Sequence, residues 1–152
     1  MEEIHEKKQE IRNDVIKFLN SMSVKERAEK TKAIEDRLFD FANFLEANIS
    51  LLYVNGRYEV KTRDIMHKTL EYNKIVVLPA YTMEKHKTRL MKIDNMDTNL
   101  IPGPKGVLEP DKNQCKKVPI ECIDIAIIPG IAFDEKGARI GSGTGFYDRL
   151  IP

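Results

Sequence analysis

A glycine-rich loop, Gly-Ser-Gly-Thr-Gly at residues 141–145, lies near the end of the chain. Because glycine has no Cβ, successive backbone N–H groups of such a loop can turn toward one anion and approach it closely. A helix is expected to begin near Thr144, and its positive N-terminal end favours the same anion. The loop therefore indicates a phosphate site. Its spacing matches neither the Walker sequence nor the dinucleotide fingerprint, and a flexible glycine turn is the alternative.

Charged side chains on either side of the loop suit the same chemistry. Arg139 could hold a phosphate through two parallel hydrogen bonds. Asp148, on the first turn of the expected helix, is placed to hold a metal ion that bridges phosphate oxygens, or else to act only as a partner of the helix dipole. Lys8 and Arg12 are four residues apart on one helical face and can point at one anion, with a solvated cationic face as the alternative.

Composition excludes several other functions. The 152 residues are expected to form a single domain, residues 1–152. The formal net charge of +1 argues against a nucleic-acid-binding surface, and no apolar run is long enough to span a membrane. Cys115 and Cys122 lack the spacing of a zinc or redox motif, while His5, His67 and His86 are scattered among charged residues. The charged N-terminus lacks the apolar segment of a signal peptide, so we expect a cytoplasmic protein.

The first third of the chain predicts two helices. Apolar residues recur at helical spacing from Ile4 to Phe18. The sequence Ser23-Val24-Lys25-Glu26 then has the pattern of a capping box, so a second helix is expected to begin there. The residues expected to face inward from this second helix are Ala28, Ile34, Leu38, Phe41 and Leu45.

The middle of the chain predicts a parallel strand–helix–strand unit. Short apolar runs at residues 49–54 and 74–79 are typical of buried strands. Between them, Thr62 can cap a helix whose inner residues are Ile65, Met66 and Leu70. Strand, helix and strand within about 30 residues form a βαβ unit, which makes the two strands parallel.

The last third predicts the edge of the sheet where ligands bind. Residues 89–93 are expected to form a more exposed strand, residues 95–117 a loop, and residues 123–128 another strand of parallel type. The glycine loop follows this last strand, and ligands of open α/β sheets bind at the carboxyl ends of the strands.

The segment from Asp124 to Arg149 reads DIAIIPGIAFDEKGARIGSGTGFYDR. It resembles the PG.AFD..G.R.G.G.G.YYD pattern of the 5-formyltetrahydrofolate cyclo-ligase (5,10-methenyltetrahydrofolate synthetase) family. Weaker similarities run in the family's order through the rest of the chain, at residues 8–12, 21–27, 59–62, 78–79 and 106–110.

The resemblance implies an α/β fold, a three-layer sandwich with a mainly parallel sheet and helices on both faces. It also implies an ATP- and Mg²⁺-dependent enzyme that cyclises 5-formyltetrahydrofolate to 5,10-methenyltetrahydrofolate, with ADP and phosphate released. The implied partners are a folate substrate and ATP, without nucleic acid or membrane. A relative that binds nucleotide or folate with impaired catalysis is the alternative.

The resemblance assigns roles to individual residues. Arg139 and Tyr147 would be catalytic, and Asp148 would bind magnesium. The residues implied for ATP binding are Lys8, Arg12, Arg139, Gly141, Ser142, Gly143, Thr144, Gly145, Phe146 and Tyr147. Those implied for substrate binding are Val54, Glu59, Ser142, Gly143, Thr144, Gly145 and Phe146. For Val54 and Tyr147, packing in the core is an equally good interpretation.

The family's sequences continue beyond the position where this chain ends, with further strands and another metal-binding acid. We therefore expect the chain ending at Pro152 to be C-terminally incomplete, weakly active or inactive, and either a monomer or weakly self-associating through an unpaired edge.

Overall fold

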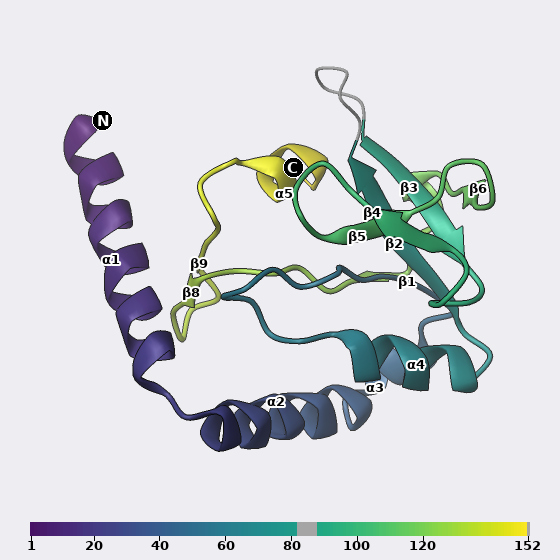
Figure 1. Cartoon of the computed structure of the whole chain (residues 1–152), viewed down its shortest axis with the longest axis horizontal. Helices are drawn as coiled ribbons and strands as arrows, with labels where there is room; N and C mark the ends of the chain where they lie inside the picture. Colours follow the sequence, from purple (N-terminus) through teal and green to yellow (C-terminus); the bar gives the residue numbers. More distant parts are fainter. Residues whose placement is uncertain (82–87, 152) are drawn as a thin grey trace.

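The computed structural model describes residues 1–81 and 88–151, so His86 and Pro152 lie outside the described residues. Its helices are α1 (Glu2–Ser21), α2 (Val24–Phe39), α3 (Ala42–Glu46), α4 (Arg63–Glu71), the 3₁₀ helix η1 (Ile120–Cys122) and α5 (Phe146–Leu150). Its strands are β1 (Ile49–Leu51), β2 (Ile75–Tyr81), β3 (Thr88–Ile93), β4 (Leu100–Pro102), β5 (Leu108–Pro110), β6 (Lys116–Lys117), β7 (Ile125–Ala126), β8 (Ala132–Phe133) and β9 (Arg139–Ile140). Figure 1 shows their arrangement.

The central sheet has five strands in the order β6-β3-β2-β1-β7. Strand β1 pairs in parallel with both β2 and β7, whereas β3 pairs antiparallel with β2 and with β6. The α/β class is confirmed, and so is the predicted βαβ unit, which is β1–α4–β2. The sheet is mixed, with a parallel centre and an antiparallel edge, because only six residues separate β2 from β3, fewer than the crossover between parallel strands needs.

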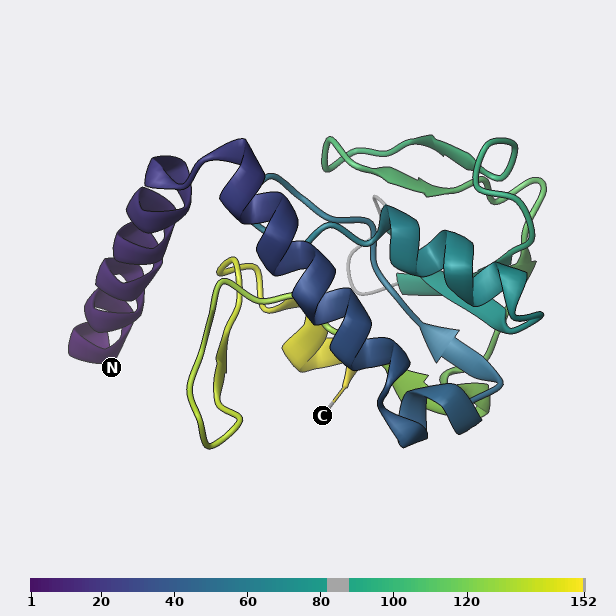
Figure 2. The same cartoon turned by 90° about the horizontal axis from the view of Figure 1, so that it is seen from below.

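The two faces of the sheet are covered unequally. Along β2, Val76 and Leu78 face one core cluster, while Ile75 and Val77 face the other, as the two-residue period of a strand requires. The first cluster is covered by α2, α3 and α4, and Figure 2, seen from below, shows these helices in front of the sheet. The second cluster is smaller, and its helical cover comes from the end of α5 at Leu150.

The capping box is confirmed, but the inner face predicted for the second helix is wrong in most positions. The Glu26 N–H donates to Ser23 Oγ at 3.1 Å, and Ser23 N–H donates to Glu26 Oε2 at 3.0 Å. Of the five residues expected to face inward, Leu38 packs against the core, whereas Ala28, Ile34, Phe41 and Leu45 are exposed. For Phe41 and Leu45 the reason is a break at Asp40, after which the separate helix α3 buries Phe44 instead. Ala28 and Ile34 lie within α2, on a side of the helix that stays exposed.

Three smaller expectations also need correction. Residues 89–93 are not an exposed strand, since Leu90, Met91 and Ile93 of β3 are buried. Residues 95–117 are not only loop, because they form the β4–β5 hairpin and the edge strand β6. The strands predicted at 49–54 and 123–128 are shorter, although Leu52 and Tyr53 remain buried beyond the end of β1.

Helix α1 lies apart from this core. None of its 20 residues is buried, and Phe18 is 61% exposed. Figure 1 shows it standing at one side of the molecule, next to the β8–β9 hairpin. No helix among the described residues combines the length and the hydropathy needed to cross a membrane.

Candidate functional site

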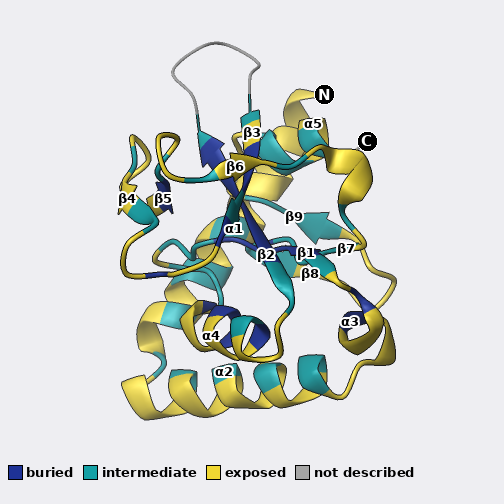
Figure 3. Cartoon of the chain, turned by 90° about the vertical axis from the view of Figure 1, so that its right-hand side faces the viewer, coloured by how far each residue is buried: buried dark blue, intermediate teal, exposed yellow. Residues whose placement is uncertain are grey.

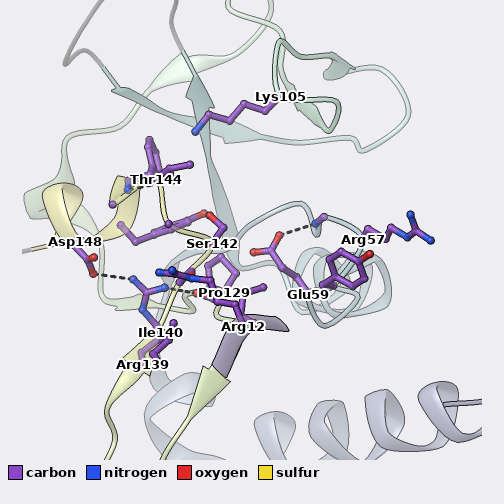
Figure 4. A pocket seen from close by; sticks show the side chains of 18 of the residues that line it. Arg12, Arg57, Glu59, Lys105, Pro129, Arg139, Ile140, Ser142, Thr144 and Asp148 are labelled. Atoms are coloured by element: carbon purple, nitrogen blue, oxygen red, sulfur yellow. Dashed lines mark hydrogen bonds and ion pairs between the residues drawn. The ribbon is translucent and has the colours of Figure 1, made fainter. Parts of the chain in front are cut away.

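One cavity of about 470 Å³ brings together segments that are far apart in the sequence. It lies between α1, the segment after β1, the β4–β5 hairpin and the glycine loop, and Figure 4 shows it from close by. Every residue assigned to the site from the sequence lines it: Lys8, Arg12, Val54, Glu59, Arg139, Gly141, Ser142, Gly143, Thr144, Gly145, Phe146, Tyr147 and Asp148.

Arg12 attaches α1 to the glycine loop. Its Nε–H donates to the carbonyl oxygen of Gly141 at 2.8 Å. A Cβ on Gly143 would lie 3.7 Å from the Arg12 Cζ, so the guanidinium is in van der Waals range of the loop. Lys8 lines the same cavity from one helical turn earlier. The two cations predicted to share one anion therefore meet the predicted phosphate loop.

The loop needs glycine at two of its positions. Gly143 has φ of +106° and Gly145 has φ of +69°, both in the region that side chains disfavour. Gly145 is also the N-cap of α5, which has only five residues. A helix this short adds little dipole, so the loop's own N–H groups are the main feature that suits an anion.

Arg139 and Asp148, which were assigned separate ligands, are bonded to each other. Arg139 Nη2 donates to Asp148 Oδ1 at 2.9 Å, and its Nη1 donates to the Pro129 carbonyl at 2.8 Å. The Arg139 side chain is 20% exposed and that of Asp148 is 77% exposed. The guanidinium thus connects the end of the β7 segment to α5, and it fixes where the exposed carboxylate stands.

Glu59 lies across the cavity in a compact turn. Its Oε1 accepts a hydrogen bond from the Gly56 N–H at 2.7 Å. The segment around it is held by the Tyr53 hydroxyl, which donates to the Val60 carbonyl at 3.0 Å, and by Thr62 Oγ1, which donates to the Tyr53 carbonyl. Thr62 is the residue before α4 as predicted, but its hydroxyl holds this turn and does not cap the helix.

Aromatic side chains line the same cavity next to the glycine loop. The Phe146 ring centroid lies 4.7 Å from that of Tyr81 and 4.8 Å from that of Tyr147. The Tyr147 hydroxyl is buried and lies close to the Tyr81 side chain. Burial raises the pKa of this phenol, and Tyr81 raises it further, so Tyr147 stays a neutral donor.

Val54 lines the cavity and also packs against the larger core cluster, so its position agrees with either interpretation.

Sequence reasoning missed several residues of the cavity: His5, Arg57, Tyr58, Tyr81 and Lys105. His5 precedes Lys8 by one helical turn, a spacing that could have revealed it. Nothing in the local sequence marks Lys105, because its place depends on how the β4–β5 hairpin folds over the sheet. In the part of the chain that the structure describes, no group of three or more His, Cys, Asp or Glu side chains could hold a metal ion.

Comparison with known proteins gives a consistent match. The model of the 5-formyltetrahydrofolate cyclo-ligase family matches residues 4–152. The 5-formyltetrahydrofolate cyclo-ligase of Haemophilus influenzae is 27% identical over 147 residues, which are 96% of this chain and 78% of that protein. A probable 5-formyltetrahydrofolate cyclo-ligase of Caenorhabditis elegans is 28% identical over 155 residues, covering 99% and 75% of the two chains.

Solved structures agree with this match. The NMR structure of Aquifex aeolicus 5,10-methenyltetrahydrofolate synthetase superimposes with a TM-score of 0.80 and 29% identity, over 94% of this chain and 71% of that one. The 5,10-methenyltetrahydrofolate synthetase of Mycoplasma pneumoniae gives a TM-score of 0.68 at 19% identity, over 93% of this chain and 75% of that one, which supports the fold alone.

Proposed function

The chain belongs to the 5-formyltetrahydrofolate cyclo-ligase family, a family of ligases, and from that premise we propose that it cyclises 5-formyltetrahydrofolate to 5,10-methenyltetrahydrofolate with conversion of ATP to ADP and phosphate. The observation that carries the proposal is that one cavity is lined both by the glycine loop with its neighbouring cations and by the Glu59 carboxylate. A reaction between a nucleotide and a pterin needs both kinds of site next to each other.

The nucleotide phosphates would lie on the loop side. Ser142 and Thr144 supply hydroxyl and backbone donors, while Lys8 and Arg12 supply charge from α1. Arg12 already bonds the Gly141 carbonyl, so its guanidinium is oriented toward the loop before any ligand arrives. Preorganised donors of this kind favour phosphoryl transfer, in which positioning and charge neutralisation matter more than a protein nucleophile.

The folate would lie on the side of Glu59. One carboxylate oxygen of Glu59 accepts from the Gly56 N–H, and the other has no hydrogen-bond partner among the described residues. A carboxylate held in this way suits the adjacent N–H donors of a pterin ring. Val54 and Phe146 would contact the flat ring from either side of that carboxylate.

The proposed reaction has two steps. The formyl oxygen attacks the γ-phosphorus, whose bond to the ADP oxygen breaks; nitrogen 10 then attacks the formyl carbon, loses its proton, and phosphate leaves with the formyl oxygen. Tyr147, a neutral phenol that lines the cavity beside Tyr81, would hydrogen-bond an oxygen that gains charge in these steps. Arg139 would act through Asp148 and Pro129, which it holds in place, as well as through its charge.

A magnesium ion fits this site only together with the nucleotide. Mg²⁺ in phosphoryl-transfer sites is bound by one or two carboxylates, substrate phosphates and water. Asp148 is a single exposed carboxylate at the end of the glycine loop, which agrees with that arrangement. Its bond to Arg139 Nη2 would have to be shared or exchanged when the ion binds.

The test is a spectroscopic assay of methenyltetrahydrofolate formation from 5-formyltetrahydrofolate and MgATP, with a reaction lacking ATP as control. We expect turnover that requires ATP. Binding of both ligands without turnover would contradict the proposal and would favour the impaired relative.

Glu59→Gln tests whether the folate and the nucleotide bind on different sides of the cavity. We expect 5-formyltetrahydrofolate affinity to fall roughly ten- to hundredfold, since a charge-assisted hydrogen bond is lost. ATP affinity should stay nearly unchanged in calorimetry. Equal losses for both ligands would mean that Glu59 holds the turn at Gly56 and does not bind the folate.

A further inference from the structure

Lys105 stands on the wall of the cavity that faces the glycine loop. It lies in the turn of the β4–β5 hairpin, between residues 103 and 107. Its Nζ is 4.1 Å from the ring centroid of Tyr81 and 4.8 Å from that of Phe146. Figure 4 shows the amine directed into the pocket, toward the side where Thr144 lies. The two rings hold a cation at a fixed place, because an ammonium group is attracted to aromatic faces.

The amine makes no direct ion pair among the described residues, although the Glu109 carboxylate is near enough to affect its pKa. The ion pairs of those residues do not include Lys105. By contrast, the guanidinium groups on the other wall are bonded to protein acceptors: Arg12 to Gly141, and Arg139 to Pro129 and Asp148. Lys105 therefore keeps its three N–H donors for a ligand.

The position of the amine favours a ligand on the loop, not one at Glu59. Phe146, over which the amine lies, directly follows the loop residue Gly145. Burial lowers the pKa of Lys105, and so does Arg149, whose Nη1 donates to the Thr144 carbonyl at 2.8 Å, whereas Glu109 raises it. The amine thus lies near the C-terminal end of the loop, where Phe146 follows Gly145. The loop's own side chains, Ser142 and Thr144, carry no charge.

We propose that Lys105 binds the terminal phosphoryl group of the nucleotide from the wall opposite the glycine loop, and that it neutralises charge on that group during its transfer. The loop and Arg12 would hold the phosphates on one side, and Lys105 would close the other. A partly desolvated amine is suited to this, because its attraction to an anion is weakened less by water. This inference rests on the proposed function, since it assumes that a nucleoside triphosphate occupies the loop.

The test compares two nucleotides that differ by that phosphoryl group. Calorimetry measures the affinity of Lys105→Met for ADP and for a non-hydrolysable ATP analogue, both with Mg²⁺. We expect the affinity for the analogue to fall roughly ten- to hundredfold and the affinity for ADP to change less than about twofold. Lys105→Arg, which keeps the charge, should retain most of the preference for the analogue. Lys112→Met is the matched control, since Lys112 follows the same hairpin but does not line the cavity.

Kinetics supply a second readout. Loss of a donor that acts on the transferred group should lower kcat of Lys105→Met roughly hundred- to thousandfold and raise KM for ATP in line with the lost analogue affinity, with KM for folate changing much less. Equal losses of ADP and analogue affinity, or a selective rise in KM for 5-formyltetrahydrofolate, would overturn the proposal. The latter result would assign Lys105 to a folate carboxylate instead.

Failure of the proposed function gives a different pattern. A wild-type chain that prefers the ATP analogue over ADP but shows no turnover would contradict the cyclo-ligase activity, and the nucleotide comparison would still decide the role of Lys105. A wild-type chain that binds neither nucleotide would overturn both.

Discussion

Helices α1 and α4 have opposite relations to the core. Helix α4 has nine residues and buries Ile65, Met66 and Thr69 against the sheet. Helix α1 has twenty residues and buries none, and Figure 3 shows the contrast between the two in the burial of their residues. Yet α1 supplies Lys8 and Arg12 to the cavity, while no residue of α4 lines it. The shorter helix therefore stabilises the fold, and the longer one serves the site.

This difference shows that an apolar stripe at helical spacing does not by itself indicate burial. Both helices have such a stripe, but most of the stability of a helix in a protein comes from tertiary packing, so α1 depends on the contacts that it makes. Its most specific contact is the hydrogen bond from Arg12 to the Gly141 carbonyl. Binding of a phosphate at the loop would add to that contact and so would order α1 further.

The largest expected effect on stability comes from α4. Ile65→Ala removes a side chain that is 2% exposed, so we expect the free energy of unfolding to fall by about 2–5 kcal/mol. Urea unfolding followed by circular dichroism measures it. The control is Ile34→Ala on α2, which is 45% exposed and should cost much less. A loss below about 1 kcal/mol for Ile65→Ala would mean that α4 is not the helix that holds the core.

A smaller effect on stability, but a large one on binding, is expected from α1. Arg12→Ala should weaken ATP binding roughly ten- to hundredfold, because a charge-assisted contact to phosphate is lost. The melting temperature should hardly move, since no residue of α1 is buried. Calorimetry and thermal unfolding measure the two effects, with Lys7→Ala as control, because Lys7 bonds Glu3 and does not line the cavity. A large fall in melting temperature with unchanged ATP affinity would mean that Arg12 stabilises the fold and does not bind the nucleotide.

The smallest effect is expected on the apolar face of α1. Phe18→Ser changes a side chain that is 61% exposed, so the free energy of unfolding should change by less than about 0.5 kcal/mol. Urea unfolding at two protein concentrations measures it. A loss above about 1 kcal/mol, or a dependence on concentration, would show that this face is covered in solution and that α1 does contribute to stability.

Much of the fold could be predicted because its signals are local. The capping box at Ser23, the apolar runs that became β1 and β2, and the helix containing Ile65 and Met66 each depend on residues close together in the sequence. The break at Asp40 and the β4–β5 hairpin were missed, since each depends on what the neighbouring segment packs against.

The sequence by itself determined the α/β class, the glycine loop and the residue types of the site. Glycine at 143 and 145 follows from backbone conformations that other residues disfavour, and these are local properties of the chain. A family pattern written in consecutive residues could be recognised for the same reason.

Only the tertiary structure decided which of these residues meet. It joined Arg139 to Asp148, placed Arg12 on the Gly141 carbonyl across 129 positions of the chain, and brought Lys105 over Phe146. None of these contacts has a local signal, because each depends on how the sheet orders its strands and where the hairpin and α1 are placed around it. The sequence specifies which charged side chains the site contains, but the packing of the elements decides where each side chain points and which group it contacts.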